Sequence, residues 1–132
     1  MLNSRSLEIG RIIKNILSQD TLLSKQIGTK IYPLVADKGT NFPFIVYRRD
    51  GVTPSSNKDS LVYDVTVRMS LIIASSDYKQ GLDLLSRTID TLLQELPKET
   101  DCTDIEILDT SEEYRDDTFL QLLSIGINIK NK

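Results

Sequence analysis

The sequence predicts an α+β fold, in which a single-layer antiparallel β-sheet of about four to five strands carries helices packed mainly on one face. Two observations lead to this prediction. Strict two-residue alternation over Leu61–Ala74 indicates a long half-buried strand, and a helical apolar stripe over Tyr78–Leu96 follows it directly. The expected element order is α-α-β-β-β-α-β-β, and 132 residues suit one domain, 1–132.

The chain begins with two predicted helices. The first follows a capping residue, Asn3 or Ser6, and its apolar residues recur at three- and four-residue steps. These apolar residues are Ile9, Ile12, Ile13, Ile16 and Leu17. Asp20 is suited to begin a second, shorter helix, and Gly28 is suited to end it because glycine readily adopts left-handed backbone angles.

Two strands are predicted next, around Ile31–Val35 and over Phe44–Val52. Pro33 and Pro43 lack the amide hydrogen that a central strand donates, so they belong at strand starts or edges. The polar, turn-rich segment Gly51–Ser60 is expected to form an exposed loop before the long alternating strand.

The long helix is predicted to have defined ends. Ser75 or Ser76 can cap its beginning, and Pro97 is expected to end it because the residue before a proline avoids the helical conformation. Its apolar stripe consists of Tyr78, Leu82, Leu85, Ile89, Leu92 and Leu96. A stripe of this length favours a helix that packs across the sheet over a coiled coil, which needs a longer repeat.

Two final strands are predicted, Thr103–Thr110 and Phe119–Ile129, joined by an acidic turn over Ser111–Asp117. The alternating pattern of the last strand again indicates one buried face. Both strands extend the antiparallel sheet.

Several apolar residues fall outside the faces that these patterns bury. On the strands they are Val62, Ile72, Leu120 and Leu122, and on the long helix they are Leu84 and Leu93. Adjacent apolar residues on an outer sheet face indicate a partner surface. The alternatives are that the N-terminal helix covers the strand residues and that the helix leucines widen the buried face.

The composition leaves little room for catalysis. Histidine and tryptophan are absent, which excludes Ser-His-Asp and Cys-His nucleophile systems and His-ligated zinc. The single cysteine, Cys102, lies between acidic residues that oppose thiolate formation. No glycine pattern binds phosphate, and the acidic run Asp109–Asp117 lacks the spacing of a calcium loop. We therefore expect no enzyme, cofactor or metal; a carboxylate-dependent enzyme is the remaining catalytic alternative.

Charge and hydropathy limit the partners and the compartment. A net charge of −3 disfavours a protein that coats nucleic acid, and the only compact basic spot is Arg48-Arg49. Charged residues interrupt the N-terminal apolar residues, and no segment is apolar for the length of a membrane span. These patterns predict a protein that is cytoplasmic when made and has no membrane partner.

A family resemblance rests on the strand region and the elements after it. The pattern Ile31-Tyr32-Pro33, then Phe42-Pro43-Phe44-Ile45-Val46-Tyr47, then the long strand and the Tyr78–Leu96 helix resembles the tail-completion or tail-terminator proteins of long-tailed bacteriophages. The resemblance covers roughly Leu7 to Ile129 in length and element order.

The resemblance implies a structural protein encoded among the virion genes of a phage or prophage. Such proteins form a hexameric ring that caps the tail tube, stops its polymerisation and meets the head–tail connector. The implied partners are copies of the chain itself, the tail-tube protein and the connector, with DNA only as passing cargo. The implied location is the bacterial host cytoplasm during assembly and then the tail or neck of the virion.

Under this resemblance, two groups of residues are candidates for contacts. The subunit or partner interface is expected at Val62, Ile72, Leu84, Leu93, Leu120 and Leu122. Lumen-facing or tube-facing loops are expected to contain Lys38, Asn41, Arg48, Arg49, Asn57, Lys58 and Asp59. A head-closure or head–tail adaptor protein and an unrelated cytoplasmic α+β binding module remain the alternatives.

Overall fold

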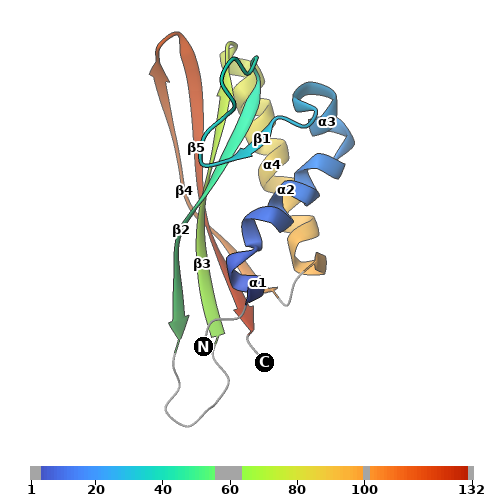
Figure 1. Ribbon diagram of the computed structural model, residues 1–132, viewed down its shortest axis with the longest axis vertical. Helices are drawn as coiled ribbons and strands as arrows, with labels where there is room; N and C mark the ends of the chain where they lie inside the picture. The colour runs from blue at the N-terminus through green and yellow to red at the C-terminus, as the bar shows by residue number, and fades with distance from the viewer. Residues whose placement is uncertain (1–3, 56–63, 100–101, 131–132) are drawn as a thin grey trace.

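The computed structural model describes residues 4–55, 64–99 and 102–130. Its helices are α1 (Ser4–Leu7), α2 (Ile9–Gln19), α3 (Thr21–Ile27) and α4 (Tyr78–Glu99). Its strands are β1 (Ile31–Pro33), β2 (Phe44–Ser55), β3 (Asp64–Ser75), β4 (Cys102–Arg115) and β5 (Thr118–Lys130). The α+β class and the element order are confirmed, with the first expected helix divided at Glu8 into α1 and α2 (Figure 1).

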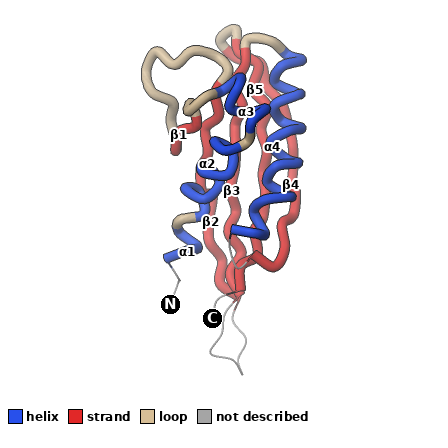
Figure 2. Tube along the Cα trace, turned by 90° about the vertical axis from the view of Figure 1, so that its right-hand side faces the viewer, coloured by secondary structure: helices blue, strands red, loops and turns tan. Residues whose placement is uncertain are grey.

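The strands form one sheet in the order β1-β2-β3-β5-β4, and the helices lie on one face of it (Figures 1 and 2). Strands β2 to β5 pair antiparallel, as the sequence predicts. Strand β1 differs because it runs parallel to β2, with Ile31 beside Ile45. The segment 34–43 carries the chain back to the end where β1 begins, so the sheet is mixed at this edge.

The core lies between the sheet and the helices. Strands β3 and β5 bury one face each, through Val65, Val67, Met69, Leu71, Ile73, Leu123, Ile125, Ile127 and Ile129. Helices α2 and α4 cover them with Ile9, Ile13, Ile16, Leu17, Leu84, Leu85, Leu92 and Leu96. Two-residue alternation in the strands and three- and four-residue steps in the helices produce this single interface.

Helix α4 differs from prediction at both ends. Its cap is Asp77, whose Oδ2 accepts a hydrogen bond from the Gln80 amide at 2.9 Å, while Ser75 is buried and accepts from the Asp77 amide. The helix also continues through Pro97 to Glu99. Pro97 lies in the last turn, where the missing amide removes one hydrogen bond without interrupting a longer run.

Two predicted loops are partly strand. Residues 51–55 continue β2, and residues 111–115 continue β4, so the turn between β4 and β5 is only Asp116 and Asp117. Both turn residues have positive φ, 53° and 59°, as a two-residue hairpin turn of the type I′ class requires. The expected acidic turn over Ser111–Asp117 is therefore too long.

Candidate assembly surface

The sheet face opposite the helices is covered by no described helix (Figures 1 and 2). Two neighbouring rows of apolar side chains cross it on three strands. The first row is Phe44, Ala74 and Leu120, and the second is Val46, Ile72 and Leu122. Residues paired across antiparallel strands share a face, so these apolar rows form one continuous surface.

The apolar rows remain partly accessible in the single subunit. Ala74 is buried, whereas the other five side chains are half-buried. Phe42 extends the surface beyond β2, because its exposed ring stacks on Phe44 with the ring centroids 5.6 Å apart. A contiguous apolar surface of this kind is typical of a protein–protein contact.

The structure brings together three of the predicted interface residues. Ile72 and Leu122 are paired neighbours, and Leu120 lies in the adjacent row. The alternative that the N-terminal helix covers them is wrong, because α2 packs on the opposite face of the sheet (Figure 1).

The other predicted interface residues lie elsewhere. Leu84 is 2% exposed and belongs to the core, so the alternative of a wider buried face is correct for this residue. Leu93 is 43% exposed on α4, on the helical side of the molecule and away from the apolar rows. Val62 lies outside the described residues.

Sequence reasoning missed Phe44 and Val46 as members of this surface. Their strand begins with a continuous apolar run, Phe44–Tyr47, and β2 buries Ile45 between them. An uninterrupted run indicates a strand that is apolar on both faces, and that signal identifies these residues.

The rest of the uncovered face is mainly polar, apart from the exposed Leu108 side chain over Gly126, and includes a cluster around Asp50. Arg48 Nε donates to Asp50 Oδ1 at 2.8 Å, and the Ser70 hydroxyl donates to the other carboxylate oxygen. Arg68 Nη1 donates to Thr53 Oγ1 at 2.6 Å. The guanidinium of Arg68 lies over Gly51, where an added Cβ would collide with it.

The residues expected in lumen-facing or tube-facing loops are divided among several places. Arg48 and Arg49 lie within strand β2, at positions that face opposite sides of the sheet. Lys38 and Asn41 are exposed in the segment between β1 and β2, as expected for loop residues. Asn57, Lys58 and Asp59 lie outside the part of the chain that the structure describes.

An open groove of about 450 Å³ lies at the β1–β2 edge of the molecule. Its apolar lining comes from Leu7, Gly10, Pro33, Leu34, Tyr47 and Met69, and its charged lining from Glu8, Arg11, Arg48 and Arg49. Arg49 Nη1 donates to the Leu7 carbonyl at 3.2 Å, and burial raises the pKa of the Tyr47 hydroxyl. We call this feature the edge groove.

Strand β4 forms the opposite edge of the sheet and is tied to α4 through Glu112. The Tyr78 hydroxyl donates to Glu112 Oε2 at 2.8 Å, and Gln121 Nε2 donates to the same oxygen at 3.1 Å. The hydrogen bond from Gln121 is the largest cause that lowers the pKa of Glu112, and the bond from Tyr78 lowers it further. The same bond to Glu112 raises the pKa of Tyr78. The contacts join the β4 edge to α4 and to β5.

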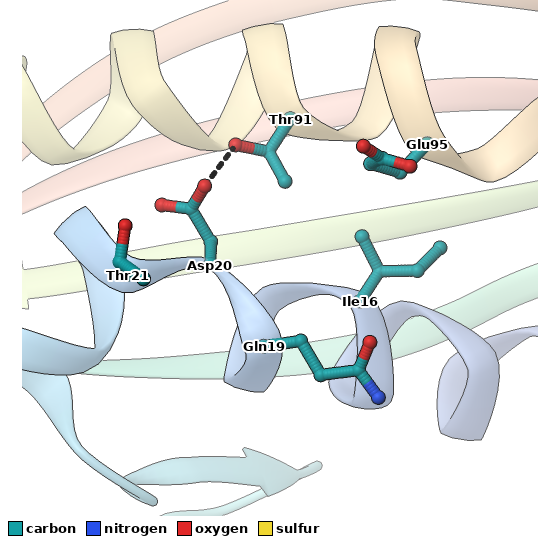
Figure 3. A pocket seen from close by; sticks show the side chains of 6 residues that line it. All are labelled: Ile16, Gln19, Asp20, Thr21, Thr91 and Glu95. Atoms are coloured by element: carbon teal, nitrogen blue, oxygen red, sulfur yellow. Dashed lines mark hydrogen bonds between the residues drawn. The ribbon is translucent and has the colours of Figure 1, made fainter.

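A small polar pocket of about 290 Å³ lies between the α2–α3 corner and α4 (Figure 3). Asp20 dominates it: its carboxylate accepts from Arg87 Nη2 at 2.6 Å, from Arg87 Nε at 3.1 Å and from Thr91 Oγ1 at 3.4 Å. The same carboxylate caps α3 by accepting from the Leu23 amide at 3.0 Å. Hydrogen bonding from Arg87 is the largest cause that lowers the pKa of Asp20. These interactions join α2, α3 and α4 through one side chain.

The described residues contain neither a candidate metal site nor a membrane-spanning helix. These residues contain no group of three or more His, Cys, Asp or Glu side chains that could hold a metal ion. Within the same ranges, no helix has the length and apolar character needed to cross a membrane.

Comparison with known proteins gives a match in structure alone. No protein-family model matches the sequence, and no curated protein sequence matches it. A chain from a solved structure described as "Virion of native gene transfer agent (GTA) particle" superimposes with a TM-score of 0.75. The match covers 90% of this chain and 92% of that chain at 12% sequence identity. The protein therefore has the fold of a chain found in that virion structure.

Proposed function

We propose that the protein is a structural subunit of a phage-type virion, a tail terminator or tail-completion protein that assembles as a hexameric ring. The ring caps the tail tube and joins it to the head–tail connector. One observation carries this proposal: the fold is shared, over nearly the whole of both chains, with a chain from a gene transfer agent virion. The sequence resemblance to tail-terminator proteins supports the finer role.

The uncovered sheet face supports an assembly role. The apolar rows and Phe42 provide a surface that a single subunit leaves half-exposed, and such surfaces pack against other proteins. In the ring, we assign this surface to contact with a neighbouring structural protein, such as the tail-tube protein. Leu93, on the helical side, remains a candidate for a separate contact.

The proposed function includes no catalytic step. The two described carboxylates with a lowered pKa, Asp20 and Glu112, already have hydrogen-bond partners within the subunit. Their depressed pKa values keep them ionised near neutral pH, which suits structural bonds and opposes a role as a general acid or base.

DNA is a passing cargo in this proposal. The net charge of −3 gives the protein little attraction for the phosphate backbone, so a strand can slide through the ring without being held. Assembly takes place in the bacterial host cytoplasm, and the finished ring belongs to the tail or neck of the particle.

Deletion of the gene in a particle-producing strain tests the role. Loss of a tail terminator is expected to give tail tubes of uncontrolled length that fail to join heads, seen by electron microscopy. Complementation with the unmodified gene restores normal particles. Tails of normal length that remain unattached to heads would instead indicate a head-closure or adaptor protein, and unchanged particles would contradict a virion role.

A further inference from the structure

We propose, building on the ring proposed above, that its subunits join head to tail through opposite edges of their sheets. The β2 edge of one copy packs against the β4 edge of a second copy. Arg48 then faces Asp109 of the second copy, and Arg68 faces Glu106 of the second copy. The second copy of this chain is thus the occupant of the edge groove.

Two cross-strand rows on the uncovered face end in opposite charges. The first row is Arg48, Ser70, Ser124 and Asp109, and the second is Gly51, Arg68, Gly126 and Glu106. The cation of the first row lies on β2, and the anion lies at the same level on β4. In the second row the anion, Glu106, also lies on β4, and the cation is Arg68, whose side chain extends from β3 toward β2.

Arg68 belongs to β3, but its guanidinium reaches the β2 edge. It lies over Gly51 and donates to Thr53 Oγ1 at 2.6 Å. A glycine at position 51 leaves the space that this side chain occupies, since an added Cβ would collide with the guanidinium. Both rows therefore present an arginine at β2 and a carboxylate at β4.

The two edges differ in charge along their length. Strand β4 contains five acidic residues and one basic residue: Asp104, Glu106, Asp109, Glu112, Glu113 and Arg115. The arginines at the β2 edge are Arg48, Arg49 and Arg68, beside one carboxylate, Asp50. Two β4 edges repel each other, and so do two arginine-rich edges, whereas one of each attracts. The contact that results is head to tail.

The charged groups of both edges are accessible. The Arg48 side chain is 58% exposed, and Glu106 and Asp109 are exposed as well. Neither of these two carboxylates forms an ion pair with another residue that the structure describes. Arg48 can bind a second carboxylate while it keeps Asp50, because its guanidinium has five donors.

A third row places an apolar side chain opposite the edge groove. This row is Arg49, Met69, Ile125 and Ile107. Arg49 and Met69 line the groove, and Ile107 is 38% exposed on β4 at the same level. Ile107 of the second copy therefore enters the apolar part of the groove, between the charged pairs.

The arginine and the carboxylate of each proposed pair lie in the same cross-strand row, and ring symmetry explains why this matters. Subunits of a closed ring are related by rotation alone, with no rise along the axis. When the strands run along that axis, each row of one copy continues into the same row of the next. Opposite charges at the two ends of one row thus meet in a ring, whereas a filament with a rise would separate them.

A charge-swap experiment tests this contact. Arg48→Glu places a carboxylate opposite Asp109, and Asp109→Lys places an ammonium opposite Arg48, so each variant alone repels its own copies. When the two variants alternate in a mixture, the new carboxylate of one meets the new ammonium of the other, and the remaining Arg48 meets the remaining Asp109. We expect each single variant to associate at least about ten-fold more weakly than the unmodified protein, and the equimolar mixture to recover the mass of the original oligomer.

The measurement is light scattering after size-exclusion chromatography at low salt, with Lys25→Glu and Asp83→Lys as charge-matched controls away from both edges. The controls are expected to keep the oligomer. Raising the salt about ten-fold is expected to weaken association of the unmodified protein, since salt screens exposed ion pairs.

Three results would overturn the edge contact: unmodified protein that stays monomeric at low salt, single variants that assemble like the original, or a mixture that stays dispersed. The second result would leave the ring itself standing and move its interface elsewhere. The deletion experiment above judges the virion role separately, because it depends on the particles and not on these edges.

Discussion

Asp20 connects three helices through one side chain. It ends α2, caps α3 and binds Arg87 and Thr91 of α4, with its own side chain only 8% exposed. The sequence predicted its capping role, since aspartate is a preferred cap. The pairing with Arg87 depends on where α4 lies, so it appeared only in the structure.

Replacement of Asp20 by alanine is expected to destabilise the fold. Loss of the cap alone costs about 1 kcal/mol, and the loss of the Arg87 and Thr91 hydrogen bonds adds to this. The free energy of unfolding, measured by urea denaturation, is therefore expected to fall by more than about 1 kcal/mol. Asp83→Ala removes an exposed carboxylate from α4 and should leave stability within about 0.5 kcal/mol. Equal effects of the two substitutions would contradict the role of Asp20.

Asp20 also predicts how stability depends on pH. Its pKa is lower in the folded protein, mainly because of Arg87, so its contribution is fully present above its unfolded-state pKa of about 3.9. That contribution is lost as the pH falls below this value and the carboxylate protonates. Urea denaturation between pH 7 and pH 3 should show a smaller loss of stability for Asp20→Asn than for the unmodified protein. If Asp20→Asn lost as much stability between pH 7 and pH 3 as the unmodified protein, Asp20 would not be a source of the pH dependence.

Among the elements, α2 and α4 each contain a glycine in a different environment. A Cβ at Gly10 would lie 2.8 Å from the Tyr47 ring, whereas a Cβ at Gly81 would meet only ordinary contacts, the nearest at 3.5 Å. Alanine normally stabilises a helix by about 1 kcal/mol relative to glycine. We expect Gly81→Ala to raise the stability measured by thermal or chemical denaturation. Gly10→Ala is expected to give no such increase, because the added Cβ forces α2 away from β2. Equal increases in stability for both variants would show that α2 and β2 can accommodate a Cβ at position 10.

The two faces of β5 give a second matched pair. Leu122 belongs to the apolar rows, and Leu123 is fully buried in the core. Leu122→Glu is expected to fold, with stability within about 1 kcal/mol of the original, and to lose binding to a neighbouring virion protein. Leu123→Glu is expected to unfold, since it buries an unpaired charge. Circular dichroism and co-sedimentation with tail tubes distinguish the two results, and a Leu122→Glu protein that binds normally would exclude the apolar rows as a contact.

The parts predicted correctly are those whose pattern lies within one element. Strand β3 and helix α4 each bury one face, so their periodicity is local and visible in the sequence. Strand β4 was predicted too short because residues 111–115 are exposed on both faces and carry no alternation. The parallel pairing of β1 depends on contact between separate segments, which periodicity does not encode.

The candidate surface was predictable to a similar extent. Ile72, Leu120 and Leu122 were identified because their strands already had a buried face, which left them on the other. Leu84 was assigned to the interface because it lies outside the predicted apolar stripe of α4. The helix buries a wider stripe, which includes both Leu84 and Leu85. The charged ends of the cross-strand rows required the pairing register, since Arg48 and Asp109 are far apart in sequence.

At the scale of the whole molecule, the sheet has four different boundaries, two faces and two edges. One face packs against the helices, the other carries the apolar rows, and the two lateral edges carry opposite charge. A subunit with complementary edges can close into a ring, while its uncovered face remains available to a different partner.

The proposed function requires that this chain assemble into a closed ring. Its most direct test is the molar mass of the unmodified protein at several concentrations, measured by light scattering and accompanied by negative-stain images with and without tail-tube protein. We expect a discrete oligomer of six times the 14.9-kDa subunit and ring-shaped particles. A monomer at every concentration, with no rings even beside tail tubes, would contradict assembly into a ring.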